Sequence, residues 1–493
     1  LALHHSAQFV LPEIISLADD PVFRVRKAAA LKVGSLCAVV GESLALGRLL
    51  PVYETLARDE IWGVRKASVE SLAEVAVVLP LEVRTQKLVP LLQEFYLDGS
   101  RWVRIAACQA LGPFIATLPS ESISAELLGL FTQLANTQNA TASDSDIAYY
   151  CAFNLPAVAQ AVTAARWHEV ADAFRGLATN IQWKVRRTLS FALHELARIL
   201  GQTLAESELL PTFDLFLKDL DEVKVGVVQS VCDFLAVLSP AARLKYLHSI
   251  VDIKAETDNW RFRHRLAEQL AEVGGIFPRG AVIETLVPLA LDLCTDAVAE
   301  VRCASIAQIG KLLGLVFVDE PQPLADDSPL QSFLRSITGM ASATSCYKRL
   351  NCVQICASLV SSLHTGLIVN HLLPALAPLA YDPVANVRLR LARLVKQQLL
   401  TSEVFVELPT TKDMVRAMRK DSDRDVLISI NGNDFTPPPY RCKSCPADGG
   451  LGIGSSYSEI ALSQLDSMRR DATCACACTA ADHDSFATDA HAG

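Results

Sequence analysis

The sequence contains few aromatic residues and no long hydrophobic run. Aromatic residues make up 6% of its 493 residues, whereas 51% are apolar, a composition typical of helices rich in Leu, Ala and Val. No apolar stretch of about 18 residues is free of charge and proline, so we expect no membrane-spanning helix. No signal peptide is visible. Leu1 is not a start methionine and no complete hairpin precedes the first repeat mark, so we expect a fragment of a longer chain.

Basic clusters and paired cysteines are also lacking. The formal net charge is −9 and the isoelectric point is near 5.6, with no block of Lys or Arg. This argues against nucleic acids and anionic membranes as main partners. Cys37, Cys108, Cys232 and Cys294 lie at apolar helix positions, and their spacing suggests no disulfide pairs. They are typical of buried free thiols in a cytoplasmic or nuclear protein.

No catalytic set of residues can be assembled. His194-Glu195 begins like a zinc-protease motif, but position 198 is Arg, so the second ligand is absent. Gly452-Ile453-Gly454 continues to Tyr457 where a dinucleotide-binding loop needs a third glycine. No Ser/His/Asp, Cys/His or paired-carboxylate arrangement is present. The sequence therefore predicts no enzyme and no cofactor, and it favours an interaction scaffold.

Residues 431–493 differ in composition from the rest of the chain. This tail is rich in Gly, Ser and Ala and lacks an apolar stripe, which predicts disorder. Its candidate zinc ligands are Cys442, Cys445, Cys474, Cys476, Cys478, His483 and His491. Only one Cys-x-x-Cys pair is present, whereas a zinc ribbon needs two, so we expect no metal.

A repeat of about 39 residues fills the chain before this tail. An acidic residue stands five positions before a Val-Arg step in successive units, as in Asp20 and Arg26, Asp59 and Arg65, Asp98 and Arg104, Asp296 and Arg302, and Asp382 and Arg388, with Asn180 before Arg186 and the related Arg263. A self-similar period of this length indicates stacked helical hairpins. Interpolating the period gives about eleven units over residues 1–430.

A proline recurs in phase with these marks. It lies fourteen residues before the arginine at Pro12, Pro51, Pro90, Pro288 and Pro374. Each unit thus predicts a first helix interrupted by proline, a tight turn, and an amphipathic second helix. The second helices should open near residues 24, 63, 102, 184, 222, 261, 300 and 386. The turn aspartates should cap these helices or pair with the arginines. The expected fold is an all-α solenoid, since a single hairpin cannot bury its own apolar stripe.

Several stretches go beyond a generic HEAT-type repeat. They are Asp98–Arg104 with Gln109–Ile115, Phe153–Val158, Trp183–Arg187 with His194–Ala197, Phe216–Lys224, and Asn259–Arg263 with Leu266–Leu270. Over roughly residues 10–430 the sequence resembles the family of regulatory subunit 1 of serine/threonine protein phosphatase 4. Asp382–Arg388 and Trp260-Arg261 also resemble the related scaffold subunit of phosphatase 2A.

The resemblance implies a non-catalytic subunit that holds a phosphatase catalytic subunit and helps select phosphoprotein substrates. In the phosphatase 2A scaffold, a Trp-Arg pair in a turn contacts the catalytic subunit. Trp260 and Arg261 match that pair, and Asn386 matches a contacting asparagine. Packing of Trp260 against its own repeat is the alternative interpretation of this residue. A true phosphatase 2A scaffold and a transport-type solenoid are the alternative functions.

Overall fold

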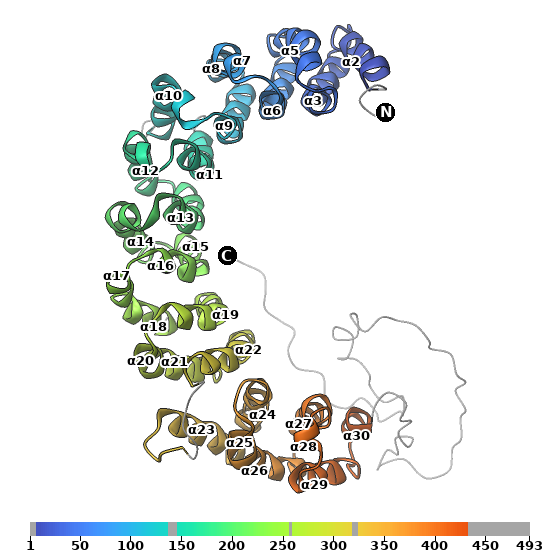
Figure 1. The fold of residues 1–493 in the computed structure, drawn as a ribbon, viewed down its shortest axis with the longest axis vertical. Coiled ribbons are helices and arrows are strands. Elements are labelled where there is room, and N and C mark those ends of the chain that lie inside the picture. Colours follow the sequence, from blue (N-terminus) through green and yellow to red (C-terminus); the bar gives the residue numbers. More distant parts are fainter. Residues whose placement is uncertain (1–5, 137–144, 256–258, 318–323, 432–493) are drawn as a thin grey trace, which may run out of the picture. The chain divides into compact units, whose positions relative to one another are not determined.

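The computed structural model describes residues 6–136, 145–255, 259–317 and 324–431. These residues form eleven helical hairpins and contain no β-strand, so the predicted all-α solenoid is confirmed. Figure 1 shows successive hairpins side by side. We number the hairpins repeats 1 to 11. The boundary predicted at residue 430 and the disordered, metal-free tail concern residues that lie largely outside the described ones, and they stay predictions.

The first helices of the repeats form one row. They contain, in chain order, α2 (Leu11–Leu17), α5 (Leu50–Ala57), α8 (Val89–Tyr96), α10 (Ala125–Ala135), α12 (Ala171–Ala178), α14 (Leu210–Phe216), α18 (Leu247–Ala255), α21 (Val287–Leu293), α23 (Pro329–Gly339), α26 (Leu373–Leu376) and α29 (Pro409–Met418).

The second helices form the other row, and each contacts the second helix of the next repeat. They are α3 (Phe23–Val40), α6 (Trp62–Val78), α9 (Arg101–Ile115), α11 (Ser145–Val162), α13 (Trp183–Leu204), α15 (Asp221–Gln229) continued by α16 (Val231–Val237), α19 (Trp260–Ile276), α22 (Ala299–Val316), α24 (Cys346–Val360), α27 (Ala385–Leu394) and α30 (Arg424–Asn431).

The recurrent proline widens the first helix by one π-helical turn. In repeat 2 the segment η2 (Ala45–Leu49) is π-helical, and the amide of Leu50 donates to the carbonyl of Ala45, five residues back. Pro51 follows immediately in α5. Proline has no N–H, and its ring clashes with the carbonyl four residues before it. A wider turn relieves that clash. The same arrangement precedes the prolines of repeats 1, 3, 6, 8 and 10.

The second helices begin one residue before the predicted positions. They open at 23, 62, 101, 183, 221, 260, 299 and 385. In repeat 2 the amide of Ile61, the residue before α6, donates to the carboxylate of Asp59. Asp59 thus closes a turn in front of the helix instead of capping a helical amide, and this sets the start of α6. In repeat 4, α11 begins at Ser145.

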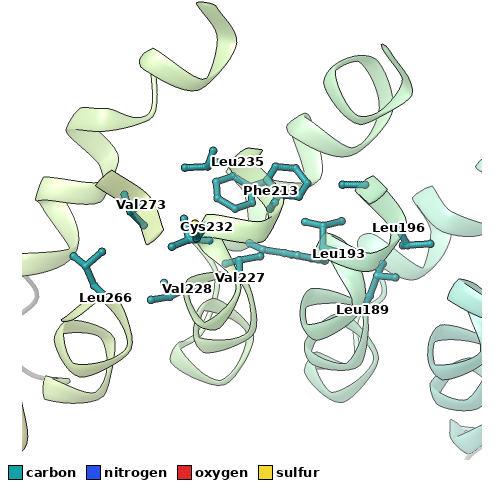
Figure 2. Close-up of a cluster of buried hydrophobic side chains, with 14 of the residues drawn as sticks. Leu189, Leu193, Leu196, Phe213, Val227, Val228, Cys232, Leu235, Leu266 and Val273 are labelled. Carbon is teal, nitrogen blue, oxygen red and sulfur yellow. The ribbon is translucent and has the colours of Figure 1, made fainter. Parts of the chain in front are cut away.

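The core lies between the two rows and continues from repeat to repeat. Figure 2 shows Leu189 and Leu193 of α13, Phe213 of α14, and Val227 and Cys232 of repeat 6 meeting in one cluster. Phe213 stacks on Phe234 with ring centroids 4.5 Å apart. Because each hairpin buries its apolar stripe against its neighbours, the stack is a single cooperative core in which no repeat stands alone.

None of the described helices is both long and apolar enough to cross a membrane.

Candidate partner-binding edge

The turns between first and second helices form one edge of the stack, which we call the turn edge. A ladder of arginine–aspartate ion pairs holds it together. Arg65 of α6 donates from Nε to Asp98 at 2.7 Å and from Nη2 at 2.8 Å. Its third nitrogen, Nη1, donates to the carbonyl of Asp59 in its own turn at 2.8 Å. One guanidinium therefore joins the turns of two successive repeats.

The same bidentate pair recurs wherever a repeat arginine and an aspartate lie 33 residues apart. Within the described ranges the pairs are Arg26–Asp59, Arg65–Asp98, Arg186–Asp219, Arg263–Asp296, Arg349–Asp382 and Arg388–Asp421. Asp219, Arg349 and Asp421 were absent from the predicted ladder. The sequence signal that could have identified them is a constant spacing of 33 residues between an arginine of one repeat and the aspartate of the next repeat.

Four predicted ladder residues make only part of these contacts. Asp20 accepts the amide of Val22 and the carbonyl of Asp20 accepts Arg26. Arg104 and Arg302 donate to the carbonyls of Asp98 and Asp296 in their own turns. Asn180 accepts the amide of Gln182, as an aspartate does elsewhere.

The ladder shifts the ionisation of its members. Burial of Asp98 opposes its ionisation, but hydrogen bonds from Arg65 and from the amide of Ser100 outweigh that effect, so the pKa of Asp98 lies below its ordinary value of 3.8. The hydrogen bond to Asp98 raises the pKa of Arg65. Both groups are therefore charged at neutral pH, and a bidentate pair between them fixes the turn geometry.

Trp260 and Arg261 begin α19 on the turn edge. Trp260 is half-buried and packs against the core, with its ring edge-to-face to His264 at a centroid distance of 5.9 Å. Arg261 is exposed, and its guanidinium carbon lies 5.4 Å from the centre of the Trp260 ring. The Asn259 side chain accepts the amide of Arg261 and donates to Asp221 of the preceding repeat. The pair is thus held rigidly with the arginine outward.

Asn386 lies on the turn edge of repeat 10. It is exposed at the start of α27. A hollow of about 740 Å³ opens between repeats 10 and 11, and its lining includes Tyr381, Arg388 and Lys420 together with Asp382, Asp413 and Asp421. Tyr381 is 76% exposed. Asn386 does not line this hollow, although Arg388, two residues further along α27, does. Trp260 and Arg261 lie three repeats away.

Exposed aromatic side chains recur along the turn edge. Phe23, Trp62 and Trp183 are the first residues of their helices and Trp102 is the second residue of its helix. Trp62 and Trp102 are 47% and 54% exposed. An exposed aromatic row on a rigid edge is typical of a protein-binding surface.

Among the described residues, no group of His, Cys, Asp or Glu is arranged to hold a metal ion. The candidate zinc ligands of the tail lie outside that part of the chain.

Comparison with known proteins connects this architecture to one family. A family model described as "Protein phosphatase 4 regulatory subunit 1 middle domain" matches residues 151–253. Serine/threonine-protein phosphatase 4 regulatory subunit 1 of Mus musculus is 35% identical over 309 residues. The chain resembles this phosphatase regulatory subunit. The Homo sapiens protein of the same name is also 35% identical. The resemblance predicted from sequence is confirmed.

The match is partial in length. It covers 61% of this chain and 32% of the mouse relative, so the chain spans about a third of the curated relatives that it matches. Among solved structures, importin beta superposes with a TM-score of 0.51 at 14% identity and covers 86% of this chain and 55% of that one. At this identity the likeness concerns the helical solenoid fold alone.

Proposed function

We infer that this chain is a non-catalytic regulatory subunit that binds a serine/threonine protein phosphatase catalytic subunit of the phosphatase 4 type and helps select its phosphoprotein substrates. The observation that carries the proposal is the 35% identity over 309 residues to proteins named phosphatase 4 regulatory subunit 1. We expect it to act in the cytoplasm or the nucleus.

The turn edge supplies the contact surface in this proposal. Trp260 and Arg261 are the anchors, with Asn386 and the hollow beside Tyr381 as a second contact. Tryptophan, tyrosine and arginine are the usual energetic anchors of interfaces. The Asp–Arg ladder supports them, because it holds consecutive turns in fixed register and so lowers the conformational entropy lost on binding.

The chemistry of the buried cysteines fits a subunit without activity of its own. Burial raises the pKa of the Cys37 thiol to about 12, and burial also raises that of Cys294 to about 12. Thiols of this kind are protonated at neutral pH and are poor nucleophiles. Reactions on a phosphoprotein would then depend on the catalytic partner and on the metal ions that such a partner carries.

Affinity capture with the purified chain tests the proposal. Immobilised full chain is incubated with equal concentrations of the phosphatase 4 and phosphatase 2A catalytic subunits, and each bound fraction is quantified. Preferential capture of the phosphatase 4 subunit is expected. Preferential capture of the phosphatase 2A subunit would favour the alternative scaffold function. Capture of neither, together with binding to a basic transport cargo, would favour the transport-type solenoid.

A further inference from the structure

The second helices of repeats 8 to 10 collect positive charge. Together α22, α24, α27 and η11 (Val395–Leu399) contain one acidic residue, Glu300, in a chain of net charge −9. Their basic residues are Arg302, Lys311, Lys348, Arg349, Arg388, Arg390, Arg393 and Lys396. Arg349 and Arg388 are paired with Asp382 and Asp421, so the positive charge that is free to attract anionic groups comes from the other basic residues of these helices.

A groove of about 540 Å³ runs across these helices. Its lining contains the apolar or small side chains Ile306, Ala307, Val353, Ala357 and Leu394, with the polar Gln354, Gln397, Arg390 and Arg393, and it contains no Asp or Glu. The lining side chains that come from α22 and α24 are mostly small. A Cβ on Gly310 of α22 would lie 2.5 Å from the Ser358 carbonyl oxygen of α24, so these two helices are in close backbone contact next to the groove.

Arg390 and Arg393 are not used by the fold. Both are exposed, and they lie one helical turn apart on α27. Neither has an ion pair or hydrogen bond to any described residue. Arg388 of the same helix is different, because it binds Asp421 through two nitrogens. Two free guanidinium groups beside an apolar floor suit carboxylates, which arginine binds bidentately.

We propose that this groove binds an extended acidic segment of a partner protein. Two carboxylates of the segment bind Arg390 and Arg393, while a small apolar side chain between them packs on Ala307 and Ala357. The amides of Gln354 and Gln397 are placed to hydrogen-bond to its backbone. The groove lining has no aromatic side chain on which bases could stack, which favours a peptide over a single-stranded nucleic acid.

The groove is built from second helices of repeats 8 to 10, whereas the anchors Trp260 and Arg261 lie in repeat 7, so variants of the two sites can be tested separately. Of the proposed phosphatase contacts, Asn386 lies nearest to it, one helical turn before Arg390 on α27.

Fluorescence anisotropy with the full chain tests the proposal. The probe is a fluorescein-labelled peptide in which Glu and Ala alternate over about a dozen residues, and the control probe has Gln in place of Glu. We expect binding of the Glu peptide alone, weakened as salt rises. The double variant Arg390→Ala with Arg393→Ala should lose at least about tenfold in affinity, as expected for two charged hydrogen-bonding groups.

A matched variant tells whether peptide binding depends on the two groove arginines or only on the total positive charge of the chain. Arg24→Ala with Lys27→Ala removes two positive charges at the same spacing from α3 of repeat 1, where both side chains are exposed. It should bind the Glu peptide like the wild type. An equal loss in both double variants would overturn the proposal. So would equally tight binding of a single-stranded oligonucleotide of similar length that depends on the same two arginines.

A second readout needs no substitution. Cys303 lines the groove and is exposed, whereas Cys346 is partly exposed and does not line it. Saturating Glu peptide should slow the alkylation of Cys303 by iodoacetamide several-fold and leave Cys346 unchanged, as followed by peptide mass spectrometry. Unchanged alkylation of Cys303 at saturation would place the peptide elsewhere and refute the assignment.

Discussion

Arg388 of repeat 10 joins the turns of two repeats through three hydrogen bonds. Its Nε lies 2.7 Å from Asp421 Oδ2 in repeat 11, and its Nη1 lies 2.6 Å from the carbonyl oxygen of Asp382 in its own turn. The carboxylate of Asp382 forms an ion pair with Arg349 of repeat 9. The ladder is therefore continuous across three repeats, and each aspartate is shared between a side-chain pair and a backbone turn.

Breaking one ladder pair should destabilise the stack. Arg65→Ala leaves Asp98 buried without its ion partner, and we expect a loss of about 2 kcal/mol in the free energy of unfolding, in the range of hydrogen bonds to charged groups. Urea denaturation followed by circular dichroism measures it. Arg58→Ala is the matched control, because the Arg58–Glu94 pair is half exposed and should contribute about 0–1 kcal/mol. Equal losses would contradict a structural role for the ladder.

The ladder also predicts a pH dependence. The pKa values of Asp59, Asp98, Asp296, Asp382 and Asp421 are all lowered from 3.8. The unfolded chain therefore takes up protons first as the pH falls. Their stabilising contribution is complete above the unfolded pKa and is lost as the pH drops through the lower folded values. The urea midpoint should fall steeply below about pH 4. The Arg65→Ala variant should show a shallower decline, and parallel profiles would argue against this origin.

Trp260→Ala with Arg261→Ala should weaken binding of the phosphatase 4 catalytic subunit about 30-fold, which corresponds to about 2 kcal/mol for hot-spot side chains. Biolayer interferometry measures the affinity. Arg187→Ala with Phe191→Ala is the matched control, because this arginine also lies over an aromatic ring but within α13 and beyond the turn, and the affinity of this variant should be unchanged.

The melting temperature decides between the two interpretations of Trp260. A contact residue leaves it nearly unchanged, whereas a packing residue lowers it by several degrees. A stable double variant that still binds like the wild type would move the contact to Asn386 and the hollow beside Tyr381.

Gly112 should be intolerant of a side chain. A Cβ there would lie 2.4 Å from Asn154 Oδ1, and the amide of Asn154 donates to the carbonyls of Cys108 and Tyr150. Gly112→Ala should destabilise the junction of repeats 3 and 4 by about 1–3 kcal/mol through overpacking. Gly129→Ala on α10 has nothing within 4 Å of the new Cβ. It should stabilise by up to about 1 kcal/mol through helix propensity, as measured by thermal melts.

Much of the fold was determined by the sequence alone, since it depends on local periodicity. The 39-residue period placed the second helices to within one residue in eight repeats, because helix starts are set by the turn residues next to them. The recurrent prolines marked where the first helices of repeats 1, 2, 3, 6, 8 and 10 depart from α geometry. The resemblance to phosphatase 4 regulatory subunits was also legible in short motifs such as the one around Trp260 and Arg261.

The partners of the repeat residues were decided only by tertiary structure. The sequence left open whether Arg65 pairs with Asp59 in its own unit or Asp98 in the next. Stacking settled it, because the side chain reaches the neighbouring turn while its own turn offers a carbonyl. The basic groove is a stronger case. Cys303, Ala357 and Arg390 lie far apart in an acidic sequence without a basic block, and only the packing of three second helices brings them to one surface.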